Sequence, residues 1–262
     1  GRRGPDRCGR RPHSVPMTTS GPTRVRRPRA RWLAVGVLAT AAVAGACSRE
    51  RTNVLVPDGA GTVTVMDFQE PFPLDPLPEG WRHRTFWRHR PMEMSFVTKA
   101  GVAAMRFATR DTASMLFRHV QVDLGTYPHL SWRWFIETEI DGTVDERTRE
   151  GDDHPARFFL SFVTTNGVAR QMEIIWANRR FAAGEYKMLG RFPHYVANGG
   201  AANVGRWHDE TVDLAAVYQE LWGGDPLGVT LVDLGVFCDS DDTGAESVAY
   251  IADVRVSQTP PS

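Results

Sequence analysis

An alternation of apolar and polar residues with a period of two runs through most of the chain after residue 61. Successive side chains of a β-strand point to opposite faces, so this pattern predicts strands with one buried face. Gly, Pro, Asp and Asn separate the segments and predict tight turns. The pattern predicts a mostly β fold, an antiparallel β-sandwich or jelly roll. The expected strands lie within 62–68, 94–108, 113–124, 129–140, 156–163, 170–177, 205–214, 228–237 and 247–256.

The stretch 94–108 is expected to be a hairpin that turns at Lys99, Ala100 and Gly101. One short connecting helix, at about 213–222, should interrupt the strands. Asp213 can cap its amino end, and Gly223 suits a left-handed stop before Pro226. Between them, apolar residues recur at helical spacing: Leu214, Val217, Tyr218 and Leu221.

Two strands show how the faces divide. In 129–141, the side chains of one face are those of Leu130, Trp132, Trp134 and Ile136, which predicts a core face. In 156–163, Arg157 lies on the opposite face from Phe158 and Leu160. A buried, unpaired guanidinium would be costly, so Arg157 needs an acidic partner. Asp152 or Asp153 is the expected partner.

The first residues have the layout of an export signal. An arginine-rich stretch precedes an apolar run from Trp32 to Ala46, which is shorter than a membrane-spanning helix requires. "AGAC" resembles the bacterial lipobox, which implies acylation at Cys47; ordinary cleavage is the alternative. The expected organisation is a leader and signal peptide over 1–46 with a start at Met17, a lipidated tether over 47–61, a β-sandwich domain over 62–258 and a tail over 259–262.

The balanced net charge hides an uneven distribution. The first 47 residues hold ten arginines and one acid, which leaves an excess of nine acids in the remainder. An acidic body repels phosphate backbones, so nucleic acid is not an expected partner.

With Cys47 acylated, Cys238 is expected to be a buried small hydrophobe rather than a nucleophile.

The stretch 236–244, "VFCDSDDTG", resembles the nucleophile motif of haloacid-dehalogenase-type phosphatases, but only 18 residues follow Gly244, too few for the rest of that fold. An EF-hand also fails, because the twelfth position is Tyr250. Asp239 and Asp241 could still hold Ca²⁺, since hard cations need several oxygens. The alternative is a turn whose carboxylates bind backbone amides.

The stretch 137–146 suggests glycoside cleavage. Glu139, Ile140 and Asp141 match the first half of the motif of laminarinase-like glycosidases, but the third carboxylate, expected near Val144, is missing. Such enzymes need paired carboxylates.

A repeat at 81–90, "WRHRTFWRHR", is either a basic, aromatic surface for an acidic polymer or a solvated strand with buried tryptophans.

Several spaced motifs resemble one family. The stretches 151–162, 173–178, 205–214 and 236–256 look like the domain-of-unknown-function family 3047 of exported bacterial proteins, to which no activity is assigned. The stretch 125–134 is similar to jelly-roll carbohydrate-binding modules. That resemblance implies a glycan-binding face built from Asp152, Asp153, Arg157, Trp176, Asn178, Asp239 and Asp241. Trp176 would stack on a sugar ring. Because Trp176 shares a face with Met172 and Ile174, a core position is the alternative.

The sequence therefore predicts a lipoprotein of the bacterial cell envelope, on the outer membrane or facing the periplasm. Its domain is expected to bind a cell-wall or extracellular glycan without catalysis and without a cofactor other than possible Ca²⁺. One alternative is a glycan-cleaving enzyme that uses Glu137, Glu139 or Asp141. The other is an envelope assembly protein whose acidic patch meets another protein.

Overall fold

The computed structural model describes residues 54–68, 73–141 and 143–261. The strands are β1 (Thr62–Met66), β2 (Trp81–Thr85), β3 (Glu93–Lys99), β4 (Val102–Arg110), β5 (Ser114–Asp123), β6 (His129–Thr138), β7 (Arg157–Thr164), β8 (Ala169–Ala177), β9 (Tyr186–Leu189), β10 (Phe192–Gly199), β11 (Trp207–Asp213), β12 (Val229–Phe237) and β13 (Glu246–Ser257). The α-helix is α1 (Leu214–Trp222), and short 3₁₀ turns lie at Arg149–Gly151 and Ala201–Asn203.

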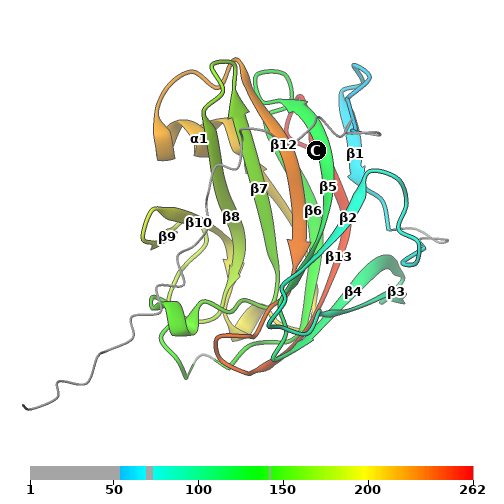
Figure 1. The fold of residues 1–262 in the computed structure, drawn as a ribbon, viewed down its shortest axis with the longest axis vertical. Coiled ribbons are helices and arrows are strands. Elements are labelled where there is room, and N and C mark those ends of the chain that lie inside the picture. Colours follow the sequence, from blue (N-terminus) through cyan, green and yellow to red (C-terminus); the bar gives the residue numbers. More distant parts are fainter. Residues whose placement is uncertain (1–53, 69–72, 142, 262) are drawn as a thin grey trace, which may run out of the picture. The chain divides into compact units, whose positions relative to one another are not determined.

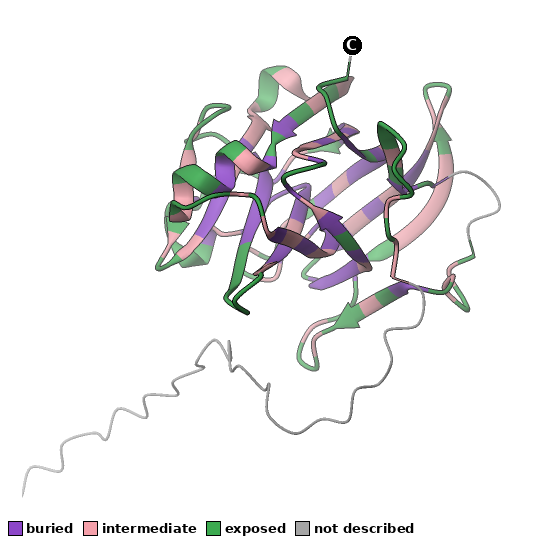
Figure 2. Ribbon diagram, turned by 90° about the horizontal axis from the view of Figure 1, so that it is seen from above, coloured by how far each residue is buried: buried purple, intermediate pink, exposed green. Residues whose placement is uncertain are grey.

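The strands form two sheets that share one hydrophobic core, which confirms the predicted β-sandwich (Figure 1). One sheet has the order β11-β6-β13-β4-β3, and β1 pairs with β13 beside this path. The other has seven strands in the order β2-β5-β12-β7-β8-β10-β9. Buried positions lie along the strands, and exposed positions gather in the connecting loops (Figure 2).

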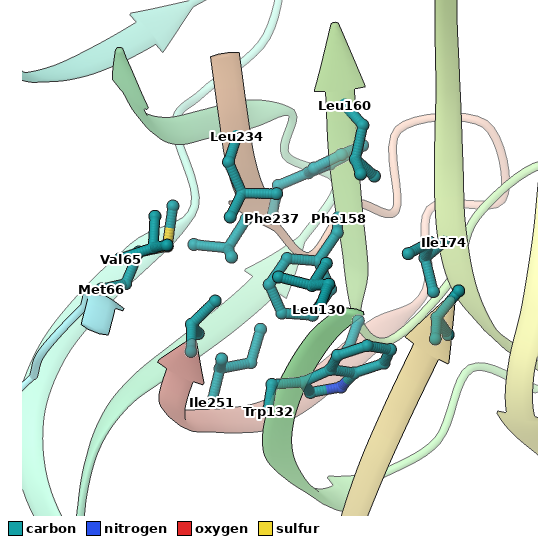
Figure 3. Close-up of a cluster of buried hydrophobic side chains, with 14 of the residues drawn as sticks. Val65, Met66, Leu130, Trp132, Phe158, Leu160, Ile174, Leu234, Phe237 and Ile251 are labelled. Carbon is teal, nitrogen blue, oxygen red and sulfur yellow. The ribbon is translucent and has the colours of Figure 1, made fainter. Parts of the chain in front are cut away.

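Tryptophans from both sheets form the centre of the core. Trp132 and Trp134 of β6 are buried, as the alternation predicted. Trp132 lies 4.9 Å from Phe158 of β7, and Trp134 lies 5.4 Å from Trp176 of β8, measured between ring centroids. Figure 3 shows Leu130 and Trp132 beside Phe158 and Ile174. Large aromatic side chains bury much apolar area and therefore contribute strongly to stability.

The hairpin and the helix are confirmed. β3 and β4 pair in antiparallel register around Ala100 and Gly101, which both have positive φ. Asp213 accepts a hydrogen bond from the amide of Ala216 and caps α1, and Gly223 ends the helix with a φ of 70°. No helix among the described residues is both long and apolar enough to cross a membrane.

The stretch 178–200 differs from the expectation, because it contains two strands that the alternation did not predict. β9 pairs with β10 in antiparallel register, and β10 pairs with β8 in parallel register, so this sheet is mixed. Pro193 lies inside β10, and a proline normally argues against a strand because it has no amide proton for the ladder.

The basic repeat at 81–90 forms a strand only as far as Thr85. Its two tryptophans have different environments: Trp81 is 5% exposed and Trp87 is 87% exposed. Cys238 is fully buried, as expected of a small hydrophobe. Cys47 and the expected leader lie outside the described residues.

Candidate functional site

Arg157, the first residue of β7, joins two loops that are far apart in sequence. Its Nη2 lies 2.7 Å from the Oδ1 of Asp239, which follows β12. Its Nη1 lies 2.9 Å from the Oε2 of Glu173 on β8 and 3.7 Å from the Oδ2 of Asp152. The guanidinium also donates to the backbone carbonyl of Asp152. The expected acidic partner is therefore Asp152, supplemented by two acids that sequence proximity could not indicate.

Asp153 joins the same two loops without contacting Arg157. Its fully buried carboxylate accepts hydrogen bonds from the amides of Asp242, at 3.3 Å, and Thr243, at 2.6 Å. The Nδ2 of Asn178 donates to the carbonyl of Asp153 at 2.7 Å. The backbone amide of Asn178 donates in turn to the buried carboxylate of Glu146 at 2.7 Å. These contacts fix the loops at one end of the sandwich.

The unpredicted strands β9 and β10 complete the cluster. Lys187 of β9 forms an ion pair with Asp152, and its Nζ lies 2.9 Å from the Nε2 of His154. His194 of β10 lies 3.2 Å from Glu173. All three basic side chains are buried. We call Asp152, Asp153, His154, Arg157, Glu173, Lys187, His194 and Asp239 the ionic network.

The pKa values follow from burial and pairing. Burial acts to raise the pKa of the Asp152 carboxyl, but Arg157, His154 and His194 together outweigh burial and hold that pKa well below its usual range. Burial, together with the nearby Lys187, lowers the pKa of His154 to about 3, so this imidazole is neutral at pH 7. Burial acts against the charge of Arg157, yet the surrounding carboxylates raise its pKa. The network therefore holds one fixed guanidinium among carboxylates.

Four predicted ligand residues are corrected, because they are buried. The exposed fractions are 0% for Asp153, 3% for Arg157, 4% for Asn178 and 0% for Trp176, so a glycan cannot reach them. Trp176 stacks edge-on against Trp134 and His208 in the core, and its predicted stacking on a sugar is wrong. Asp152 retains 16% side-chain exposure. The four buried residues therefore stabilise the fold from inside and are not part of the exposed surface.

The exposed surface next to the network is the outer face of the seven-stranded sheet. One row of residues crosses six strands, and each residue pairs with the next one on the adjacent strand. The row consists of Phe117, Gly235, Phe159, Glu173, His194 and Lys187. Its second half belongs to the ionic network. Its first half adjoins a hollow of about 130 Å³ lined by Arg84, Met115, Phe117, Phe159, Gln171 and Asp233. We call this the outer-face hollow.

No local sequence pattern singles out the set of residues that line this hollow. The alternation placed Phe159 on the same face as Arg157, and this was the available signal. The partners come from β2, β5, β8 and β12, whose order in the sheet no local pattern specifies. Gly235 shapes the hollow, since a Cβ at this position would lie 2.5 Å from the Sδ of Met115.

Three carboxylates could hold the predicted cation. Oxygens of Asp153, Asp239 and Asp241 lie within 4.8 Å of one another, so the structure adds Asp153 to the predicted pair. Asp153 already binds two amides and Asp239 already binds Arg157. Asp241 lies 3.5 Å from His89. Calcium at this position stays a prediction, and the amide contacts match its alternative, a turn held by carboxylates.

Two acids of the enzyme alternative, Glu137 and Asp141, are engaged in other contacts. Glu137 pairs with Lys99 at 2.6 Å and accepts a hydrogen bond from the hydroxyl of Tyr250. These hydrogen bonds lower the pKa of Glu137, whereas a general acid needs a raised one. Asp141 is exposed and lies 3.4 Å from Arg179.

The chain belongs to the family of proteins of unknown function DUF3047, whose model matches residues 79–255. No curated protein matches it.

Solved structures with a similar fold include a family 11 carbohydrate-binding module of the cellulosomal cellulase Lic26A-Cel5E of Clostridium thermocellum (TM-score 0.41, 9% identity, 77% of this chain and 97% of that chain). A family 30 module of the cellulosomal cellulase Cel9D-Cel44B of Clostridium thermocellum gives a TM-score of 0.41 at 10% identity, over 76% of this chain and 99% of that chain. The endoglucanase Cel12A from Rhodothermus marinus gives a TM-score of 0.40 at 10% identity, over 68% of this chain and 91% of that chain.

Replacing Arg157 by Met should strongly destabilise the protein. The substitution removes the guanidinium from Glu173, Asp239 and Asp152, of which Asp152 keeps Lys187 as a partner, and this loss costs about 3–5 kcal/mol. The matched control is Arg255→Met, since Arg255 is exposed and pairs with Asp253, a contact worth about 1 kcal/mol or less. Urea unfolding at pH 7.5 measures both losses. Equal losses would show that the network contributes no more than a surface pair.

Asp242 should make stability depend on pH. Burial and the carboxylates of Asp241 and Asp153 raise the pKa of Asp242 to about 6. The Asp242 carboxyl thus loses its proton near pH 6 in the folded state and near pH 4 in the unfolded chain. Between these pH values the folded state binds more protons than the unfolded chain, so the free energy of unfolding falls as pH rises through this window.

Asp242→Asn should therefore melt at a higher temperature than the wild type above about pH 7 and at the same temperature below about pH 4. Thermal melts across this range test the expectation. Asp225→Asn serves as the control, because Asp225 accepts from the amide of Leu227 within its own turn. A constant difference at every pH would contradict the assigned titration.

Proposed function

We propose that the domain is a non-catalytic module that binds a glycan across the outer face of the seven-stranded sheet. The observation that carries the proposal is the outer-face hollow, where two half-buried phenylalanines, Phe117 and Phe159, lie among polar side chains. An aromatic ring offers a flat apolar surface to the C–H face of a sugar. Arg84, Gln171 and Asp233 add hydrogen-bond donors and acceptors for its hydroxyls.

The size of the hollow indicates how a glycan would contact it. Its volume of about 130 Å³ is smaller than the roughly 300–1,000 Å³ of sites that enclose a whole ligand. It therefore suits one sugar unit of a longer chain. The ligand would continue along the sheet, toward the exposed Arg82 and Arg84 of β2 or toward the ionic network.

The ionic network supports the proposal by holding this face in one shape. Glu173 lies directly opposite Phe159, and Arg157 binds Glu173. On the other side, His119 binds Asp233 through its Nδ1 at 2.6 Å, which orients the carboxylate that lines the hollow. Binding sites whose side chains are fixed in advance lose less conformational entropy when they take a ligand.

Two substitutions in the hollow should weaken binding of a glycan that the wild type retains. Phe159→Leu keeps an apolar side chain but removes the ring, and Gln171→Ala removes a hydrogen-bonding group. Each should weaken binding about tenfold, or about 1.4 kcal/mol. Affinity gel electrophoresis against a panel of neutral β- and α-glucans, xylans and mannans measures this. The matched control is Gln121→Ala, because Gln121 lines a different hollow, together with Thr230 and Val163.

The outcomes separate the alternatives. Retention by a glycan that survives both substitutions would overturn the proposed face. Release of sugar products that Glu139→Gln abolishes would establish the enzyme alternative. If the gels retain no glycan, the assembly alternative gains support, and the glycan-binding proposal fails.

We further propose that the protein is an exported lipoprotein anchored through Cys47. The support is the arginine-rich stretch, the short apolar run and "AGAC" before Ser48. Acylation adds membrane affinity without a spanning helix. An anchored binding module would hold a glycan close to the cell surface.

The substitution Cys47→Ala tests this proposal, because it removes the thiol that would carry the acyl group. In bacterial cells, the substitution should abolish incorporation of labelled palmitate and move the protein from the membrane fraction to the soluble fraction. Ser48→Ala, the adjacent residue, should keep both properties. Palmitate labelling that persists in Cys47→Ala would contradict the anchor.

A further inference from the structure

A second cavity lies on the other sheet. It has a volume of about 470 Å³, which is within the range of ligand sites. β3, β4 and β13 form its walls, together with the turn after β4 and the segment before β3. The lining includes Arg90, Arg106 and Arg110, with Glu93 and Glu246. We call it the arginine cavity.

The arginines of this cavity are only partly neutralised. Arg110 pairs with Glu246 at 2.7 Å. Arg90 donates to the backbone carbonyl of Arg110 at 3.2 Å, which leaves its charge without a carboxylate partner. Within the described ranges of the chain, no ion pair of 4.0 Å or less joins Arg90 or Arg106 to an acid. Three arginines against two glutamates leave one net positive charge.

The walls are held by buried hydrogen bonds. Thr109 and Thr112, both in the lining, are joined through their hydroxyls at 2.6 Å. Thr109 also lies 2.8 Å from the hydroxyl of Ser240, in the loop that carries Asp239 of the ionic network. Ser247 donates to the carbonyl of Thr138 at 2.6 Å. The cavity therefore has a fixed shape at the junction of three loops.

We propose that the arginine cavity is a second binding site, which takes the carboxylate of an acidic sugar unit such as a uronic acid. A guanidinium presents a planar fork of donors that matches a carboxylate. One net positive charge balances one carboxylate, whereas a phosphate dianion would face Glu93 and Glu246 in excess. The two glutamates accept hydrogen bonds from sugar hydroxyls. This inference rests on the cavity alone and does not depend on the outer-face hollow.

Affinity gel electrophoresis tests the proposal with four polymers: polygalacturonate, neutral galactan, polyphosphate and dextran sulfate. Polygalacturonate should retard the full-length protein, with an affinity at least tenfold above that for galactan. Arg90→Gln and Arg106→Gln should each weaken that retention about tenfold. The matched controls are Arg255→Gln and Arg88→Gln, since both arginines are exposed and neither lines the cavity.

Each other outcome overturns the proposal. An equal loss of polygalacturonate retention in the control variants would indicate general attraction to polyanions. Retention by polyphosphate and dextran sulfate that is at least as strong as retention by polygalacturonate would indicate the same. No retention by polygalacturonate would also overturn it. Arg106 is half-buried beside Glu137 and Tyr250, so its substitution needs a check that the fold is intact. In that check, the melting temperatures of both cavity variants should match that of the wild type within about 2 °C. If Arg106→Gln fails this, exposed Arg90→Gln decides alone. Phe159→Leu should leave polygalacturonate binding unchanged, which separates this site from the first.

Discussion

A single buried guanidinium holds together one end of this sandwich. Arg157 binds carboxylates from the loop before β7, from β8 and from the loop after β12. Charges removed from water must be paired closely or they destabilise the fold, so these segments have one favourable arrangement. The Asp153 carboxylate adds hydrogen bonds from the backbone amides of Asp242 and Thr243, which join the same two loops. The acidic turn at 239–242 is held in place by that arrangement, through Asp239 and the amides of Asp242 and Thr243.

The row across the seven-stranded sheet shows how one register serves two purposes. Its residues on β8, β10 and β9 are the buried polar side chains of Glu173, His194 and Lys187, and its residues on β5 and β7 are partly exposed phenylalanines. Gly235 lies between the phenylalanines, where the side chain of Met115 occupies the space that a Cβ would need. A slip of one residue would exchange the two faces, so the core and the proposed binding surface are specified together.

The sequence predicted features that depend on local pattern. Alternation gave the core face of β6, and capping chemistry gave α1. The same rules missed β9 and β10, because Pro193 argues against a strand and because Lys187 and His194 look solvated while they are buried among charges. Glu173 and Asp239 could not be assigned to Arg157, since strand order is a long-range property. Alternation correctly indicated a core Trp176, whereas the resemblance to sugar-binding modules misplaced it.

The charge distribution limits which glycans suit both proposed sites. After residue 47 the chain has an excess of nine acids, so a polyanion meets net repulsion over the protein as a whole and attraction only at a locally basic site such as the arginine cavity. At physiological salt, screening over about 8 Å makes the nearest charges decide what binds at a given place. The arginine cavity offers one net positive charge locally, and the outer-face hollow offers aromatic rings. A glycan of mostly neutral units with occasional carboxylates satisfies both surfaces, while a uniformly acidic polymer satisfies only one.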